Sequence, residues 1–361
     1  MRSPSSLIHR LPRRTFSPVA VPRVVHAIVA VATLGLIPRA VRAQRLDLTV
    51  DHVGIAIGNI PRVTGLRLNF RDRGLEYVKG VNATIWSPYE PLSGRVDGLA
   101  LGLPATGAAR INGLGVGVFG VGARDEIQGI GIGGIGLGAG GNLTGIMLGG
   151  VGVGTGGRVD GIAAALVGVG SGAGLRGVMV GGIGVGGGGD VRGVAIGGIG
   201  VGGGGNLRGL VIGGVGVGVG GSVRGVTIGG IGVGAGGDVT GISIGGVGVG
   251  AGGTLKGLTI AGVGAGAPQL EGIVLTGVGA GALHAKAVVV APFYFRIDSA
   301  GTFTGGSLSA YNHIEGRQHG LTIGLINYAR ALDGVQLGII NILDRPRGRR
   351  VTVLFNAASD P

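Results

Sequence analysis

The sequence predicts an all-β fold: a β-solenoid built from Gly-rich coils of about 16 residues, with two short strands in each coil. Three observations lead to this prediction. Glycine recurs at a fixed step, aliphatic residues recur with a period of two between the glycines, and 89 of the 361 residues are Gly while hydrophobic residues still reach 45%. A disordered polar tract would lack this apolar content. Collagen would need Gly at every third position with abundant Pro, and only 13 Pro are present.

Internal repetition is the strongest signal in the chain. One unit runs from Gly225 to Thr240, and its first glycine is here called the anchor, at offset zero. The anchors follow one another at a step of 16 residues: Gly113, Gly129, Gly145, Gly161, Gly177, Gly193, Gly209, Gly225, Gly241 and Gly257. A fixed period of this length predicts that each unit is one coil of a stacked array.

Each unit carries the pattern of a strand with one buried face. Offsets +1 and +3 are aliphatic, as in Val226 and Ile228, whereas offset +2 varies and is Thr227 in this unit. Fixed and variable positions that alternate are typical of a strand with one side in the core. We therefore expect offsets +1 and +3, and likewise Ile231 and Val233 at +6 and +8, to be buried, and offset +2 to be exposed.

Glycine pairs and small polar residues predict the corners of the coil. Aliphatic residues at +3 and +6 are separated by Gly229-Gly230, and those at −2 and +1 by the anchor, so a flat strand cannot keep both members of either pair on one side. Glycine supplies the positive φ that a corner requires. Offset −3 carries residues suited to a turn: Asn142, Asp190, Asn206, Ser222, Asp238 and Thr254.

An antiparallel meander that closes into an outer-membrane β-barrel or channel is the alternative. A membrane strand needs roughly 9–11 residues, so a hairpin needs more than 16. Such a barrel also carries aromatic girdles, and no aromatic residue lies between Gly120 and Pro292. The solenoid is therefore favoured.

Composition divides the chain into four parts. Residues 1–43 resemble a signal peptide, with basic residues up to Arg14, an apolar segment from Val24 to Ile37, and small residues before Gln44. An uncleaved anchor helix is the other interpretation, and the absence of Cys excludes a lipoprotein. Residues 44–112 and 286–361 are irregular, aromatic-containing repeats expected to cap the regular array of residues 113–285. We expect the protein to be exported to the cell envelope, at the cell surface, the outer membrane or in the periplasm.

The last 60 residues resemble a known family. The segments Gly320-Leu-Thr-Ile-Gly-Leu-Ile-Asn327 and Gly334-Val-Gln-Leu-Gly-Ile-Ile-Asn341 are similar to the units of bacterial surface-repeat proteins. The 16-residue unit is more loosely similar to the rolled β heads of trimeric adhesins. The first resemblance implies an envelope-associated protein without a known catalytic activity. The second makes adhesion the closest analogy, at the level of the fold alone.

The residues indicate no enzyme, cofactor site or metal site. Gly-x-Gly-x-x-Gly recurs, but without a following helix it does not predict a dinucleotide site. His313 and His319 lie on either side of Glu315, and we interpret them as exposed turn residues because metal sites need several converging ligands. The sparse acidic residues do not pair at a spacing that suggests acid–base catalysis.

One polar column and one bare surface remain as candidate binding features. Offset −1 holds Arg176, Arg192, Arg208 and Arg224, which a solenoid would stack into a row. The row is either a solubility device or a site for envelope polyanions such as acidic glycans or lipopolysaccharide.

Glycine at offsets +5, +7 and +9 would leave the outer face of the second strand without side chains, and this bare face could mediate self-association. No nucleic acid partner is expected, because no aromatic residues accompany the Arg row for base stacking, and no small-molecule substrate is indicated.

Overall fold

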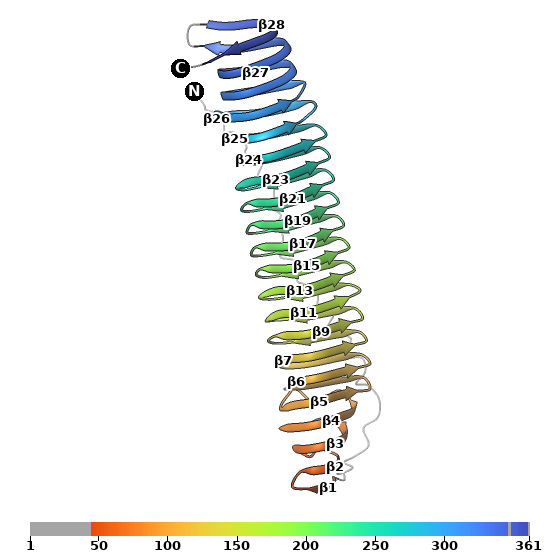
Figure 1. Cartoon of the computed structure of the whole chain (residues 1–361). Coiled ribbons are helices and arrows are strands. Elements are labelled where there is room, and N and C mark those ends of the chain that lie inside the picture. Colours follow the sequence, from red (N-terminus) through yellow and green to blue (C-terminus); the bar gives the residue numbers. More distant parts are fainter. Residues whose placement is uncertain (1–44, 346–347, 360–361) are drawn as a thin grey trace, which may run out of the picture. The chain divides into compact units, whose positions relative to one another are not determined.

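The computed structural model describes residues 45–345 and 348–359, and this part of the chain is an all-β solenoid (Figure 1). Its coils stack in chain order from β1 to β28. Within these ranges there is no helix of the length and apolarity needed to span a bilayer. The predicted fold class is confirmed. The predicted signal segment, residues 1–43, lies outside the described residues.

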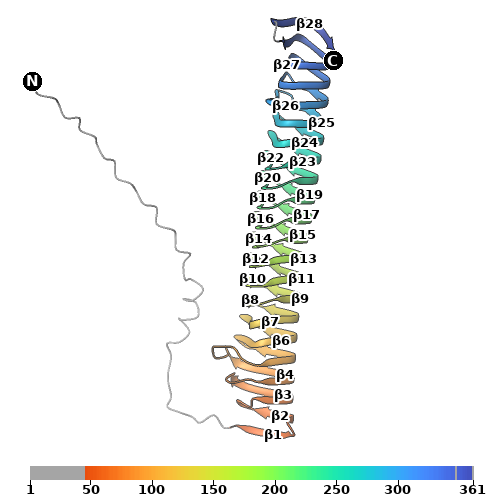
Figure 2. The ribbon, with the colours of Figure 1, turned by 90° about the vertical axis from the view of Figure 1, so that its left-hand side faces the viewer.

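Each coil of the regular array contributes one long and one short strand, and Figure 2 shows the two rows beside each other. The long strands are β9 (Leu143–Gly149), β11 (Arg158–Ala165), β13 (Gly174–Gly181), β15 (Val191–Gly197), β17 (Leu207–Gly213), β19 (Val223–Gly229), β21 (Val239–Gly245) and β23 (Thr254–Ala261). The short strands are β8 (Gly136–Ala139), β10 (Gly152–Thr155), β12 (Gly168–Ser171), β14 (Gly184–Gly187), β16 (Gly200–Gly203), β18 (Gly216–Val219), β20 (Gly232–Ala235) and β22 (Gly248–Ala251).

Most strands on either side of β8–β23 are longer, and several continue around a corner. Before β8 come β1 (Leu46–Val50), β2 (Val53–Ile57), β3 (Arg62–Arg71), β4 (Tyr77–Trp86), β5 (Arg95–Gly102), β6 (Ala105–Gly117) and β7 (Gly120–Gly133). After β23 come β24 (Gly264–Thr276), β25 (Gly279–Val290), β26 (Tyr294–Leu308), β27 (Tyr311–Arg345) and β28 (Gly348–Ala358).

Consecutive coils pair in parallel, and from Gly129 to Gly257 each residue lies opposite the one 16 positions later. Gly225 lies opposite Gly209 on one side and Gly241 on the other, so the anchors form one column along the stack. This parallel register rules out the antiparallel meander considered above. Antiparallel pairs occur at the two ends of the stack, where β1 pairs with β2 and β28 pairs with β27.

Backbone hydrogen bonds continue through both bends of the coil. At the corner after the long strand, the Ile231 N–H donates to the carbonyl of Val215 at 2.6 Å. At the turn before the long strand, the side chain at offset −3 accepts a hydrogen bond from the next coil; for example, Asn206 Oδ1 accepts from the Ser222 N–H at 3.0 Å. The small polar residues predicted for this turn therefore also link neighbouring coils.

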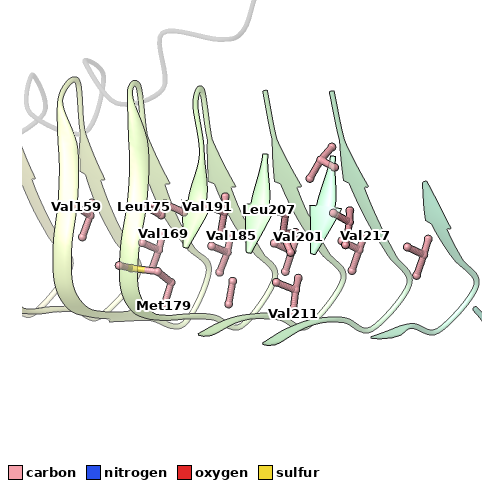
Figure 3. Close-up of a cluster of buried hydrophobic side chains, with 14 of the residues drawn as sticks. Val159, Val169, Leu175, Met179, Val185, Val191, Val201, Leu207, Val211 and Val217 are labelled. Carbon is pink, nitrogen blue, oxygen red and sulfur yellow. The ribbon is translucent and has the colours of Figure 1, made fainter. Parts of the chain in front are cut away.

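The core is narrow and consists of three inward columns, at offsets −2, +2 and +8. In the coil anchored at Gly177 these positions are Leu175, Met179 and Val185, which are 2%, 1% and 3% exposed. Figure 3 shows side chains of these columns lying between the two strand rows. The long strand contributes two columns to the core and the short strand contributes one.

The burial predicted for the long strand is wrong, because its two faces are reversed. Offset +2 is buried throughout the regular array, and Thr227 is 0% exposed. Offsets +1 and +3 point outward, and Ile146 and Leu148 are 38% and 39% exposed. Offset +6 is also exposed, with Ile231 at 55%. The prediction for offset +8 is confirmed, and offset −2 is buried as well.

The error has two physical causes. The alternation of the strand does not break at the anchor, since the glycine keeps a positive φ within a continuous strand, at +130° in Gly225. Offset −2 therefore shares a face with +2 and not with +1. The second cause is that variation at +2 reflects size compensation in the stack. Met147 and Met179 both lie next to Ala163, so each large side chain has a small neighbour.

Candidate functional site

The outer face of the long-strand sheet is aliphatic along the array. We define the aliphatic face as the outward residues at offsets +1 and +3 of the anchor column from Gly54 to Gly334. Nine side chains in each column are well exposed: Ile55, Ile130, Ile146, Ile162, Val178, Leu210, Ile242, Ile273 and Val288 at +1, and Ile57, Leu68, Ile132, Leu148, Val180, Ile196, Leu308, Ile323 and Leu337 at +3. The core does not need these side chains, because columns −2, +2 and +8 fill it.

The corner that follows the long strand extends this apolar surface. Its outward residue at offset +6 is Ile or Val in every coil anchored from Gly129 to Gly272, and Ile183 and Ile199 are 48% and 54% exposed. Phe119 and Phe293 occupy the equivalent position before and after these coils and are also exposed. The apolar surface therefore spans the face and one of its margins.

The Arg row lies along the opposite margin of the same face. Arg176, Arg192, Arg208 and Arg224 are neighbours on four consecutive long strands, as the 16-residue step predicts. All four side chains are exposed. The structure therefore brings the predicted residues together into one line beside the aliphatic face.

Two members of the row have carboxylate partners. Arg176 Nε lies 3.7 Å from Asp160 Oδ1, and Arg192 Nη2 donates to Asp190 Oδ2 at 2.7 Å. The backbone N–H of Asn206 and the Arg192 guanidinium together lower the pKa of Asp190. For Arg208 and Arg224, the part of the chain that the structure describes provides no ion-pair partner, so positive charge is concentrated at these two coils.

A shallow, mainly polar depression marks one end of the row. It is lined by Arg158, Arg176, Arg192 and Asp190, together with Ala173, Gly174 and Leu175. Arg158 was not predicted, because it lies at offset −3 and outside the Arg column. Three guanidinium groups around one depression favour an anionic ligand, and Asp190 offsets part of their charge.

The outer face of the short-strand sheet is bare in the regular array. Its outward residues are glycines, such as Gly184 and Gly186, as the pattern predicts.

Beyond the array, the same face carries an aromatic cluster that sequence reasoning missed. Tyr311 stacks on His313 with ring centroids 5.2 Å apart, and Tyr294 Oη lies 3.0 Å from His313 Nδ1. The 17-residue step from Tyr294 to Tyr311 was the available signal.

A buried ion pair lies in the N-terminal coils and was also missed. Arg67 is 0% exposed at offset +2, and its Nη1 contacts Asp72 Oδ1 and donates to Asn82 Oδ1. Burial alone would raise the pKa of Asp72, but the Arg67 charge and hydrogen bonds from Thr84, Asn69 and Asn82 outweigh it and lower the pKa. The cluster is closed to solvent, which gives it a structural role.

The core is also polar at the C-terminal end, where amide side chains bond to one another. Asn312 Nδ2 donates to Asn327 Oδ1 at 2.8 Å, and Asn327 Nδ2 donates to Asn341 Oδ1 at 2.8 Å. Asn327 and Asn341 belong to the segments that resemble surface-repeat units. Their recurrence is explained by the ladder that they form inside the coil.

The prediction that His313 and His319 are exposed turn residues is wrong, because both lie within strand β27 and are half-buried, and they do not converge. His313 Nε2 lies 3.6 Å from Glu315, whereas His319 Nδ1 lies 3.1 Å from Asp333. Within residues 45–345 and 348–359 no group of three His, Cys, Asp or Glu side chains is placed to hold a metal ion.

Comparisons with protein-family models, with curated proteins and with solved structures found no match for this chain. The fold is thus established by the structure itself, as a repeat-based β-solenoid. The resemblance of the last 60 residues to surface-repeat proteins stays a prediction.

Proposed function

We propose that this chain is an exported structural repeat protein of the bacterial cell envelope, which acts through its outer sheet faces as a scaffold or adhesin and not as an enzyme. The observation that carries the proposal is the aliphatic face. Its residues stay Ile, Val or Leu in nearly every coil although they do not fill the core. An exposed apolar patch of more than a few hundred Å² is typical of an interaction surface.

Export rests on the sequence of residues 1–43, and the envelope location rests also on the surface-repeat resemblance. Both can be tested by fractionating cells that express the full chain. We expect the protein in the envelope fraction, with Gln44 or a near neighbour as its first residue. Full-length protein in the cytoplasmic fraction, still beginning at Met1, would overturn the export part of the proposal.

Surface display is tested separately by adding protease to intact cells. Cleavage of the protein in intact cells supports a role in adhesion at the surface. Protection in intact cells, with cleavage after the outer membrane is permeabilised, would place the scaffold in the periplasm and remove adhesion from the proposal.

A second candidate function is binding of an acidic glycan or lipopolysaccharide by the Arg row. Two observations support it. The four arginines lie in register on consecutive long strands, and Arg208 and Arg224 have no ion-pair partner among the described residues. Guanidinium groups at about 4.8 Å spacing repel one another unless anions screen them. A linear polyanion bridging several of them would gain affinity by multivalency.

The test replaces Arg176, Arg192, Arg208 and Arg224 together by Ser. Retention on immobilised lipopolysaccharide or an acidic glycan at low salt should be lost, and retention of the parent should fall steeply as salt is added. The matched control replaces Arg62, Arg73, Arg110 and Arg349 by Ser, which removes the same charge away from the row. Equal retention of the row variant and the parent would leave the row as a solubility device.

A further inference from the structure

We infer that two copies of this chain pair face to face through the aliphatic face, with their solenoid axes parallel. The inference deepens the proposed function, because it assigns the occupant of the surface on which that function rests. It differs from self-association through the bare glycine face, which lies on the short-strand sheet.

The number of outward side chains is sufficient for a stable interface. A standard interface uses about 20–30 residues and buries about 800 Å² on each partner. The aliphatic face offers nine well-exposed side chains in each of its two columns. Half-buried residues such as Val194, Ile212 and Ile228 lie in the same columns and add to the surface.

The composition of the face favours a second sheet over a lipid surface. From Ile55 to Leu337 the two columns contain Ile, Val, Leu, two alanines and Gly306, and they contain no aromatic or charged residue. Membrane-interface surfaces typically combine Lys or Arg with Trp and Phe, and lipids impose no fixed spacing. Packed sheets instead need regular rows of aliphatic side chains that interdigitate at a sheet separation of about 10 Å.

The spacing of the face identifies the partner as a second copy. Each column repeats at the distance between stacked strands, about 4.8 Å, over the whole array. A partner that meets every coil must have the same repeat. Another copy of this chain has that repeat by construction, and a two-fold axis would bring the same face of each copy into contact.

The Arg row selects the orientation. If the two-fold axis ran along the strands, the solenoids would be antiparallel and offset −1 of one copy would face offset −1 of the other. Gly193 lies near the middle of the anchor column, within the row from Arg176 to Arg224, so the two rows would then repel each other. An axis parallel to the solenoid places the two rows at opposite margins. Val194 of one copy then lies opposite Ile196 of the other.

The mass of the full chain in detergent-free buffer tests the pairing. By sedimentation or light scattering at micromolar concentration we expect twice the chain mass, little changed by high salt because the contact is apolar. Ile146→Lys, Ile196→Lys and Ile242→Lys together should give the single-chain mass with an unchanged β spectrum. The control Ala173→Lys, Ser299→Lys and Ala300→Lys adds the same charge at other exposed positions and should leave the dimer intact.

A Thr version of the face variant covers the case in which the Lys variant fails to fold, since Thr is well suited to strands. It should weaken the dimer by at least ten-fold in dissociation constant. The inference is overturned if the parent is monomeric, if either folded face variant stays dimeric, or if the monomeric parent floats with phosphatidylcholine vesicles. A monomer that still reaches the cell envelope would overturn the inference and leave the proposed function standing.

Orientation is measured with one spin label, because the chain has no Cys of its own. Ser299→Cys lies in the coil before Gly305, near the C-terminal end of the stack. Parallel pairing places the two labels at the same height, about 40 Å apart across the pair at ~3.3 Å per strand residue. Antiparallel pairing would separate them by about 65 Å, at ~4.8 Å for each coil from Gly80 to Gly305. The longer distance would overturn the parallel arrangement.

Discussion

At the residue scale, the anchor glycine is the position that the backbone most constrains. Gly225 has a φ of +130°, and a Cβ placed on it would overlap with the carbonyl oxygen of Gly209 in the preceding coil. An L-residue there would combine backbone strain with a clash against backbone that cannot move aside. Close stacking at the anchors that keep this positive φ thus depends on glycine, whereas Ala287 takes the anchor position in its coil without a positive φ.

Replacement of the anchor should therefore be costly, whereas replacement of an outward glycine should not. We expect Gly225→Ala to lower the free energy of unfolding by about 2 kcal/mol or more. Gly234→Ala is the control, because a Cβ on Gly234 would meet nothing within 4 Å. It should be neutral or slightly stabilising. Chemical denaturation of both variants checks this, and an equal loss would contradict the role assigned to the anchor.

Thr227 provides the second test at this scale. It is fully buried, and its Oγ1 has no hydrogen-bond partner among the described residues. Thr227→Val keeps the shape and removes the unpaired hydroxyl, so it should stabilise the protein by about 1 kcal/mol. Thr227→Asp should unfold its part of the array, because it buries an unpaired charge. Ile228→Asp, on the outward face, should lower the free energy of unfolding far less than Thr227→Asp. A larger loss from Ile228→Asp would mean that offset +3 is buried and offset +2 is exposed, as first predicted.

The sequence predicted the coil, its period, its turns and the Arg row, because these depend on spacing along the chain. It did not predict which face of the long strand is buried. Positions that stay aliphatic in every unit were interpreted as buried, and positions that vary in size were interpreted as exposed. Met147, Ala163 and Met179 vary because they share one narrow interior. The constancy of Ile146 and Ile162 needs another cause, and an external partner supplies one.

At the element scale, the two ends of the stack differ from the middle by having polar interiors. The N-terminal coils enclose the Arg67–Asp72 pair, and the C-terminal coils enclose the ladder of Asn312, Asn327 and Asn341. Side chains in these groups are bonded to specific partners, so they fix which strand pairs with which. The middle of the stack is mostly apolar and its coils are nearly identical, so it lacks such a constraint.

The N-terminal pair makes stability depend on pH in a defined direction. The pKa of Asp72 is lowered in the folded state from its usual 3.8. Its contribution is therefore present above that value and is lost as the pH falls through the folded pKa. Asp72→Asn should shrink the difference between denaturation midpoints measured at pH 7 and pH 3. Asp47→Asn, on the exposed strand β1, should leave that difference unchanged, and an equal change in both would contradict the assignment.

At the scale of the whole molecule, stability is close to a sum over coils and the contacts between neighbours. Every long strand in the regular array pairs with the long strands before and after it, and every short strand does the same. The coils are thus interchangeable to a first approximation. The length of the array can change without a change of fold, provided that whole units are added or removed.

Deletion of one unit tests this modularity. Removing residues 193–208 joins Arg192 to Gly209, so each inward column continues and β13 (Gly174–Gly181) can pair with the strand that includes Gly209. This variant should fold cooperatively, with the β spectrum of the parent and a stack shorter by about 4.8 Å. Removing only residues 193–200 joins Arg192 to Val201, which puts a short-strand sequence where a long strand must pair. That variant should lose cooperative unfolding and expose apolar surface to a hydrophobic dye. If the 16-residue deletion behaved like the 8-residue deletion, the coils would not be independent units, and the regular repeat would have to be explained by something other than the stack.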